Sequence, residues 1–336
     1  MDLKTLTEIN APSGHEQAIR RFLLDELKKL GFAPVLDRMG NVVVVKEGMG
    51  DAPRKRVMVS AHMDEVGLIV TSATEDGYLR IAAAGGIDPR VLVSKRVTVG
   101  EDKLPGVIGA VPIHLQSAAE RKHVLSMDEL LVDIGAKNKD EAECKAPMGT
   151  YISFDTPYVE YGDGFACGKA FDDRVGCLSL LRLLQEELPV DLVACFVSEE
   201  EVGCRGAKGA AFQQEPDIGI VLEGTTCNDL GDVPETAHVC EAGQGVAVSF
   251  MDGASIANRA LFRKALDVAK QENIPHQVKH SVSGGNDGGA IQRARDGVPV
   301  VVLSVPCRYI HSPSSVVKLS DVESQFALVK ALVKAL

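Results

Sequence analysis

The chain has 336 residues, more than the roughly 250 to 300 at which a single hydrophobic core stops growing, so we expect one large α/β domain or two domains. Hydrophobic residues make up 45% and charged residues 25%, and no apolar run approaches the roughly 18 residues of a membrane span, which excludes a disordered or membrane-spanning chain. The net charge of −11 and the lack of a Lys/Arg run argue against a nucleic acid partner.

The first segments predict an amphipathic helix followed by two buried strands. Ser13 and Glu16 have the spacing of a capping box, and apolar residues then recur at helical spacing. Two apolar runs follow, at residues 42–45 and 57–61, and both are apolar enough to be buried on two faces, as strands of an α/β sheet are. The second run ends directly before His62.

The pattern changes between residues 66 and 162. Short β-rich runs are interrupted about every ten residues by Gly, Pro or Asp, which is typical of a small all-β domain. We therefore expect a discontinuous α/β domain, residues 1–65 and 163–336, interrupted by a small β-barrel-like insert, residues 66–162.

Helices and apolar strands alternate again after the insert. Helices are expected near residues 175–188, 257–271 and 288–294, and strands at 192–197, 218–222 and 298–303. A short helix is expected between the first two of these strands. Ser320 and Glu323 form a second capping-box pair, which predicts the start of a last helix that continues to the C-terminus. The predicted fold class is α/β, with helices on both faces of the sheet.

Polar residues that bind metals or transfer protons follow four of the predicted strands. These residues are His62 with Asp64, the run 199–201 (three Glu), Glu223, and His311. Strand C-termini are where open α/β sheets bind their ligands, so these groups should meet at one edge, together with the pair Asp172-Asp173. Imidazoles and carboxylates suit Zn²⁺, or Co²⁺ or Mn²⁺, and two such cations can share a hydroxide and polarise a carbonyl. The inventory predicts a hydrolase site with two divalent metal ions.

Four motifs in order resemble a known family. They lie at residues 62–67 (HMDEVG), 169–174 (KAFDDR), 200–203 (EEVG) and 308–313 (RYIHSP). Together they resemble the dinuclear aminopeptidases of metallopeptidase family forty-two. These are the glutamyl and deblocking aminopeptidases that form tetrahedral (TET) particles, some of which have been labelled endoglucanases. The resemblance extends from the first helix to the last, and it implies a mixed-sheet zinc-peptidase domain with an inserted β domain.

The resemblance also implies the metal ligands. Matched by position, His62, Asp172 and Glu223 bind one metal, and Asp172, Glu201 and His311 bind the other, so that Asp172 bridges the two. The family often has Asp where this chain has Glu223, whose side chain is one methylene longer and can still act as a ligand.

The catalytic roles come from the same matching. Asp64 holds the imidazole of His62 by a hydrogen bond, and Glu200 is the general base that takes a proton from the bridging water. The family pattern makes Glu199 a bystander, with Val202-Gly203 supplying the turn that separates the neighbouring roles. Asp173 is interpreted as a carboxylate at a helix N-terminus that can also support the bridge.

Candidate substrate-binding residues are Asp287 and Arg308. Asp287 lies in the glycine-rich stretch 283–289, interpreted as a substrate-site turn, and can bind a substrate amine or cap the next helix. An acidic substrate would need a cation near the metals, for which Arg308 and Arg205 are candidates by sequence proximity. The sequence leaves the preferred N-terminal residue open.

The predicted function is a metal-dependent aminopeptidase that acts on short peptides with a free N-terminus. The resemblance implies self-association, with the insert forming dimer contacts and dimers assembling into a tetrahedral dodecamer. Eight scattered cysteines without a CxxC pair predict free thiols and a cytoplasmic location. Two alternatives remain: a glycosidase with a carboxylate pair, against which the two histidines and the absence of Trp argue, and a non-enzymatic peptide-binding module.

Overall fold

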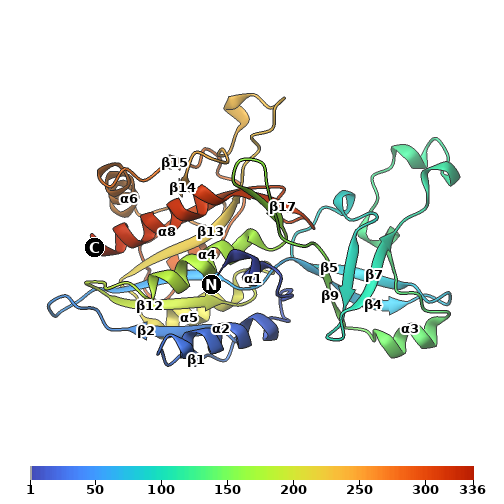
Figure 1. The fold of residues 1–336 in the computed structure, drawn as a ribbon, viewed down its shortest axis with the longest axis horizontal. Helices are drawn as coiled ribbons and strands as arrows, with labels where there is room; N and C mark the ends of the chain where they lie inside the picture. The colour runs from blue at the N-terminus through green and yellow to red at the C-terminus, as the bar shows by residue number, and fades with distance from the viewer. Residues whose placement is uncertain (1) are drawn as a thin grey trace.

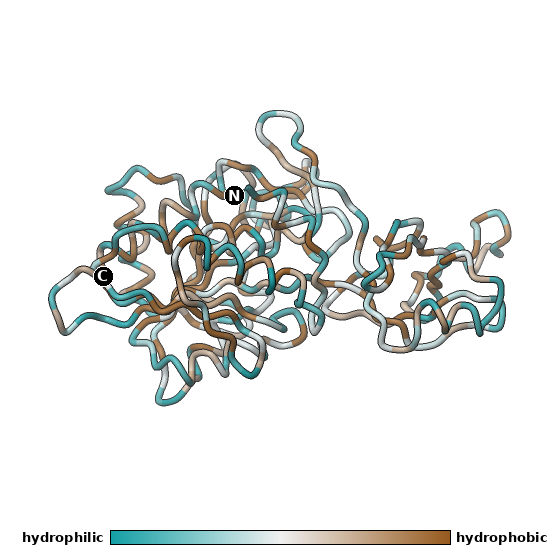
Figure 2. The backbone as a smooth tube through the Cα atoms, turned by 60° about the horizontal axis from the view of Figure 1, so that its bottom comes forward, coloured by the Kyte–Doolittle hydropathy of each residue, from teal (hydrophilic) through white to brown (hydrophobic). Residues whose placement is uncertain are grey.

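The computed structural model describes residues 2–336, so Met1, the first residue of the expected α/β domain, lies outside the described residues. An α/β body and a smaller β-barrel lie side by side along the long axis of the molecule (Figure 1). Apolar stretches of the backbone gather inside each part (Figure 2). The barrel has a hydrophobic core of its own, separate from the cores of the α/β body.

The α/β body is built on one large mixed sheet with the strand order β1-β2-β12-β3-β13-β16-β17-β11-β10, next to which β14 and β15 pair beside β16. The strands are β1 (Val35–Leu36), β2 (Val42–Lys46), β3 (Arg56–His62), β10 (Val159–Tyr161), β11 (Phe165–Gly168), β12 (Asp191–Val197), β13 (Ile218–Thr226), β14 (Val246–Ser249), β15 (His276–Val278), β16 (Val300–Arg308) and β17 (Ser315–Lys318). The central strands β12, β3, β13 and β16 are parallel, whereas β2 and β17 pair antiparallel with them. The expected fold class is confirmed.

Helices cover both faces of this sheet because its strands are apolar on both sides. Successive residues such as Val57 and Met58 enter different cores, as the alternation of side chains along a strand requires. One core is closed by α1 (Leu3–Thr7), α2 (Gln17–Lys29), α4 (Phe171–Leu183), α6 (Arg259–Gln271) and α8 (Leu319–Lys334). The other is closed by α5 (Arg205–Gln214) and α7 (Asp287–Gln292).

The insert is a closed barrel with the strand order β4-β5-β8-β7-β6-β9. Its strands are β4 (Gly67–Ala73), β5 (Leu79–Ala84), β6 (Arg96–Val99), β7 (Leu104–Gly109), β8 (Leu131–Asp133) and β9 (Tyr151–Phe154), and α3 (Lys139–Lys145) packs against it through buried Ala142. The barrel ends at Phe154, earlier than the expected boundary at residue 162. The observed boundary lies earlier because β10, which falls within the expected insert, pairs with β11 and so belongs to the large sheet.

Both predicted capping boxes are wrong. Helix α2 begins at Gln17, and Glu16 at its N-cap makes no capping hydrogen bond with its side chain. The Ser13 hydroxyl instead donates to Asp64 Oδ2 at 2.6 Å. Helix α8 begins at Leu319, so Ser320 lies inside the helix. In each case the serine and the glutamate had the right spacing, but the chain enters the helix at another residue.

Three further features bear on the sequence predictions. All eight cysteines are free in the described residues. Residues 2–336 contain no helix with both the length and the apolar character needed to cross a bilayer. Short 3-10 turns, η2 (Ile113–Leu115), η3 (Glu120–Lys122) and η4 (Met127–Glu129), punctuate the segment between β7 and β8, which projects from the barrel (Figure 1).

Candidate active site

The predicted metal ligands come together at one edge of the large sheet. His62 is the last residue of β3, Glu223 lies in β13, and His311 follows β16. Since β12, β3, β13 and β16 are neighbouring parallel strands, their C-terminal ends meet at the same edge. Asp172 reaches this edge from the first turn of α4.

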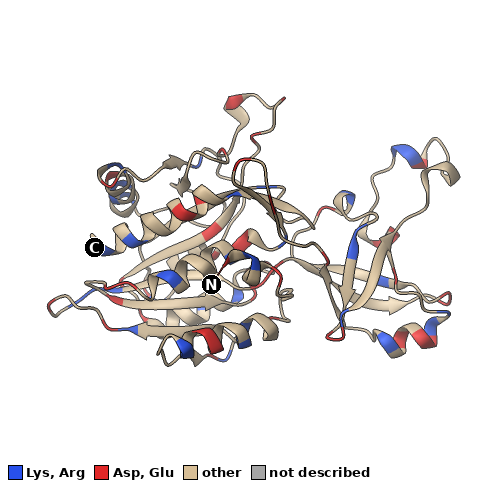
Figure 3. Ribbon diagram, viewed as in Figure 1, with Lys and Arg blue, Asp and Glu red and all other residues tan. Residues whose placement is uncertain are grey.

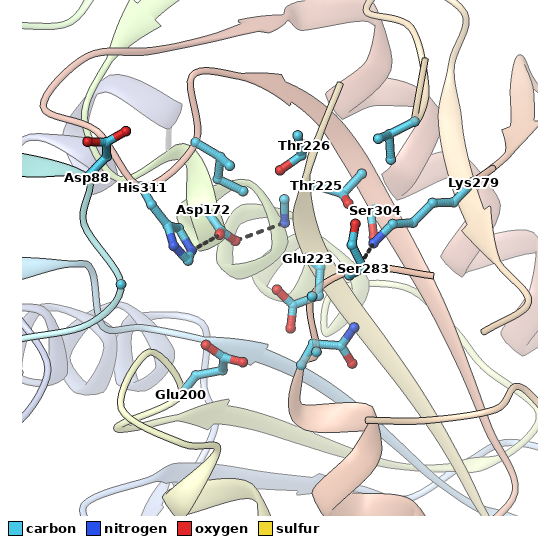
Figure 4. Close-up of a pocket in the computed structure, with 17 residues that line it drawn as sticks. Asp88, Asp172, Glu200, Glu223, Thr225, Thr226, Lys279, Ser283, Ser304 and His311 are labelled. Atoms are coloured by element: carbon cyan, nitrogen blue, oxygen red, sulfur yellow. Dashed lines mark hydrogen bonds and ion pairs between the residues drawn. The ribbon is translucent and has the colours of Figure 1, made fainter. Parts of the chain in front are cut away.

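Asp172 lies between two histidines and presents one carboxylate oxygen to each. His62 Nε2 is 3.3 Å from Asp172 Oδ1 and 3.6 Å from Glu223 Oε2. His311 Nε2 is 3.6 Å from Asp172 Oδ2 and 3.1 Å from Glu201 Oε2. Figure 4 shows Asp172 between His311 and Glu223. The structure thus forms two histidine–carboxylate pairs that share one aspartate.

Asp173 also lies close to this cluster. Its carboxylate, with ligand atoms of His62 and Glu223, forms a group in which all ligand atoms lie within 4.8 Å of one another. Asp173 Oδ1 accepts a hydrogen bond from the Gly176 N–H at 3.0 Å, as expected for a carboxylate at the start of a helix. Asp173 Oδ2 is buried and has no hydrogen-bond partner within residues 2–336.

The cluster concentrates negative charge in a buried place. Burial raises the pKa of Glu201 well above its usual range, and the neighbouring Asp172 carboxylate raises it further. Burial likewise raises the pKa of Glu223 to about 8. Burial alone would also raise the pKa of Asp172, but hydrogen bonds from His311 and His62 lower it. Such a group of carboxylates needs compensating positive charge.

The donor set fits divalent cations. Two imidazoles and three carboxylates supply the nitrogen and oxygen ligands that Zn²⁺ uses, and Co²⁺ or Mn²⁺ also accepts them. Glu223 Oε1 is buried without a hydrogen-bond partner within residues 2–336, which leaves a free acceptor beside His62. A buried acceptor is costly unless something binds it, and a cation at this position would do so.

Asp64 connects His62 to the glutamate run. Its Oδ1 accepts from the Glu200 N–H at 3.0 Å, and its Oδ2 accepts from the Glu201 N–H at 3.2 Å. His62 Nδ1 lies 3.5 Å from Asp64 Oδ1 and 3.2 Å from the main-chain oxygen of Asp64. Asp64 therefore orients the imidazole and also fixes the backbone that carries the two glutamates.

The three consecutive glutamates point to different places. Glu200 lines the pocket beside Asp172, where burial raises the pKa of Glu200 to about 8. Glu199 is not among the pocket-lining residues, and its carboxylate pairs with Arg205 at 3.3 Å. The expected turn at Val202-Gly203 is present, since the Gly203 N–H donates to the main-chain oxygen of Glu200 at 2.8 Å. Glu199 adds a second change of direction with φ +55°, which separates the direction of Glu199 from that of the two residues that follow.

Left-handed backbone recurs at three segments of the site. Ala170, Glu199 and His311 have φ values of +56°, +55° and +56°. A non-glycine residue pays roughly 1 to 2 kcal/mol for this conformation, because its Cβ approaches a carbonyl oxygen. Strain of this kind concentrates at functional sites, where the surrounding structure holds it in place. Asp172, Glu200 and His311, which lie at or shortly after these residues, all line the same pocket.

Sequence reasoning missed the buried polar groups that support the site. Lys169 Nζ contacts the two carboxylate oxygens of Glu65 at 2.7 and 2.8 Å, and both residues are buried. Arg174 is fully buried and donates to the main-chain oxygen of Met63 at 3.1 Å, next to His62. Glu65, Lys169 and Arg174 all stand inside the motifs at 62–67 and 169–174, so the motifs contained this signal.

A pocket of about 410 Å³ opens beside the cluster. Neither of the two candidate substrate-binding residues, Asp287 and Arg308, is among the residues that line it. Ser283 to Asn286, part of the predicted substrate-site turn, line it. Asp287 is buried behind them, with both oxygens unpartnered within residues 2–336, and lies close to Glu200 and Cys204. Arg308 is not a lining residue, and its guanidinium is bound to Asp229 by two contacts of 2.8 Å.

The pocket contains a cation that sequence reasoning did not identify. Among its described lining residues, Lys279 is the only Lys or Arg. It follows β15, and its ammonium group enters the pocket from the side opposite His311 (Figure 4). A single lysine after a short strand gives no sequence signal that distinguishes it from a surface lysine.

The charges of the whole molecule are drawn in Figure 3, where acidic residues recur across both the α/β body and the barrel.

The α/β fold and the histidine–carboxylate cluster are compatible with a metal-dependent hydrolase, and comparisons with known proteins identify the family. The family model for M42 glutamyl aminopeptidase matches residues 40–328, so the chain belongs to this family of aminopeptidases. A putative aminopeptidase of Acetivibrio thermocellus is 35% identical over 338 residues, covering 99% of this chain and 97% of the relative.

Comparison with solved structures supports the same family assignment. The TET aminopeptidase of the marine sediment archaeon Thaumarchaeota archaeon SCGC AB-539-E09 superposes with a TM-score of 0.94 at 33% identity, covering 99% of this chain and 95% of the other. The Pyrococcus horikoshii TET1 peptidase, which can assemble into a tetrahedron or a large octahedral shell, has a TM-score of 0.88 at 33% identity, with 99% and 98% covered. A Thermotoga maritima protein described as an endoglucanase has a TM-score of 0.82 at 34% identity, with 100% and 97% covered.

Proposed function

We propose that this aminopeptidase uses two divalent metal ions to remove N-terminal residues from short peptides. One observation carries the proposal: Asp172 presents its two oxygens to two different histidines, each of which also contacts a second carboxylate. His62, Asp172 and Glu223 would hold one ion, and Asp172, Glu201 and His311 the other. Zn²⁺ suits this set best, with Co²⁺ or Mn²⁺ as substitutes. When bound, such ions polarise a carbonyl and make water a nucleophile near neutral pH.

Glu200 is the residue that we assign to proton transfer. Its carboxylate lines the pocket together with Asp172 and Glu223. Within residues 2–336, Glu200 forms no ion pair with His62 or His311 at a distance of 4 Å or less. The Asp64 hydrogen bond to the Glu200 N–H holds this segment in place. From there a Glu200 carboxylate oxygen accepts the proton of the attacking water and returns it to the leaving amine. Asp64 keeps the His62 ring oriented during this exchange.

Metal removal tests this function directly. We expect a chelator to abolish hydrolysis of an aminoacyl anilide, and Zn²⁺ or Co²⁺ to restore it, because the proposed ions activate the attacking water and polarise the carbonyl. Metal content measured before and after treatment checks that the loss follows the metal. Full activity of the metal-free protein would contradict the proposal. A chromogenic glycoside tests the glycosidase alternative, which predicts cleavage that does not depend on metal.

We also propose that the protein self-associates through the barrel, as dimers that build a tetrahedral dodecamer. The segment between β7 and β8 supports this, since Val111, Ile113, Leu115 and Val124 are 61%, 67%, 71% and 61% exposed. Apolar side chains gathered on one projecting segment are typical of an interaction surface. The assembly and the cytoplasmic location both stay predictions.

A double substitution tests the role of this segment. We expect the wild-type protein to have a mass near twelve times 35.8 kDa, and Ile113→Asp with Leu115→Asp to have a much smaller one, because two buried charges would disrupt an apolar contact. Light scattering after size-exclusion chromatography measures both masses. Met49→Asp, at a 72% exposed position in the α/β body, is the matched control. A wild-type monomer would refute the assembly.

A further inference from the structure

Lys279 is a buried cation in a pocket whose other charged lining residues, apart from His311, are carboxylates. Its side chain lines the same 410 Å³ pocket as Asp172, Glu200 and Glu223. Although Lys279 is only 8% exposed, it forms no ion pair within residues 2–336. Its ammonium group has one weak contact, a 3.4 Å hydrogen bond to the main-chain oxygen of Ser283.

This arrangement leaves most of the hydrogen-bonding capacity of Lys279 unused. An ammonium group carries three donors, and lysine is almost never buried unless it is paired. The residues that line the same part of the pocket carry hydroxyl groups rather than carboxylates: Thr225, Thr226, Ser283 and Ser304 (Figure 4). Hydroxyl groups can share in binding an anion, but they do not neutralise the lysine.

The backbone holds Lys279 in place from two sides. Its N–H donates to the main-chain oxygen of Val248 at 3.1 Å, which continues the pairing of β15 with β14. The following turn returns along the pocket wall, where Gly284 has φ +78° and its oxygen accepts from the Gly253 N–H at 2.7 Å. The lysine therefore approaches the pocket from a fixed position, as a residue that selects substrates should.

We propose that Lys279 binds a carboxylate of the substrate and so determines which peptides the enzyme prefers. This inference rests on the proposed peptidase function. The carboxylate lies within one or two residues of the scissile bond, because Lys279 and the metal-site residues share one pocket. It belongs either to an N-terminal Glu or Asp side chain or to the C-terminus of a dipeptide.

Matched substrates distinguish the two sources in the wild-type protein. Glu-anilide and Gln-anilide differ only in the side-chain carboxylate, whereas Ala-Gly and Ala-Gly-amide differ only in the C-terminal one. We expect kcat/KM to be about 10- to 100-fold higher for the charged member of one pair, as one charge-assisted hydrogen bond provides. If neither pair shows a preference, the proposal is overturned, and this outcome does not depend on the folding of any variant.

Substitution of the lysine then assigns the preference. Lys279→Met and Lys279→Gln should reduce the charged-to-neutral ratio of kcat/KM to near 1. Lys208→Met, which removes an exposed lysine on α5, should leave the ratio unchanged. If Lys279 only supports the Ser283 turn, all substrates will lose activity together and the ratio will persist, which overturns the proposal. Failure of the peptidase function is separate, because the wild-type enzyme would then hydrolyse no anilide at all.

Discussion

Replacing Glu200 by glutamine is expected to leave both metal ions bound and to reduce kcat by about 10²- to 10⁴-fold, the contribution typical of general acid–base catalysis. Glutamine keeps the size of the side chain and the backbone bond from Glu200 N–H to Asp64, but it cannot accept a proton. Steady-state kinetics with an aminoacyl anilide measures the loss, and metal analysis of the same sample measures occupancy.

The neighbouring glutamates provide matched controls of identical chemistry. Glu199→Gln should be nearly silent, because Glu199 pairs with Arg205 outside the pocket. Glu201→Gln should lose metal as well as activity, because the Glu201 carboxylate lies 3.1 Å from His311 Nε2 in the proposed metal site. The opposite pattern, in which Glu200→Gln loses a metal ion while Glu199→Gln stops turnover with metals intact, would show that the roles are displaced by one residue.

Asp172→Asn is expected to lose both metal ions and with them all activity. Each Asp172 oxygen faces a different histidine, so an amide would remove the shared charge and turn a nitrogen donor towards one of the two sites. Loss of one ligand to a single ion, as in Glu223→Gln, should instead leave the other ion in place. Metal analysis that distinguishes two, one and no ions per chain separates these results.

The adjacent aspartate is the critical comparison for this prediction. Asp173 lies near His62 and Glu223, but its carboxylate also accepts a hydrogen bond from the Gly176 N–H. Asp173→Asn should keep both ions, since an amide oxygen can still accept that bond. If Asp173→Asn loses the metals and Asp172→Asn retains them, the bridge has been assigned to the wrong residue.

The sequence by itself determined the fold class and the place where the site forms. Alternating helices and apolar strands predicted the α/β body, and dense turn signals predicted the inserted β domain. His62 and Glu223 could be assigned to one edge because parallel neighbouring strands bring their C-terminal ends together. Local patterns suffice for such statements, since strand direction and the positions of strand ends follow from residues close together in the chain.

Only the tertiary structure decided which polar residue faces which. Ser13 had the spacing of a helix cap, yet its hydroxyl binds Asp64, 51 positions along the chain. Arg308 and Arg205 were the candidate cations near the substrate, but Asp229 binds Arg308 and Glu199 pairs with Arg205, whereas Lys279 lines the pocket. A polar side chain can satisfy its hydrogen bonds in several ways of similar free energy. The choice among them depends on groups that approach only when distant segments pack, which no local pattern records.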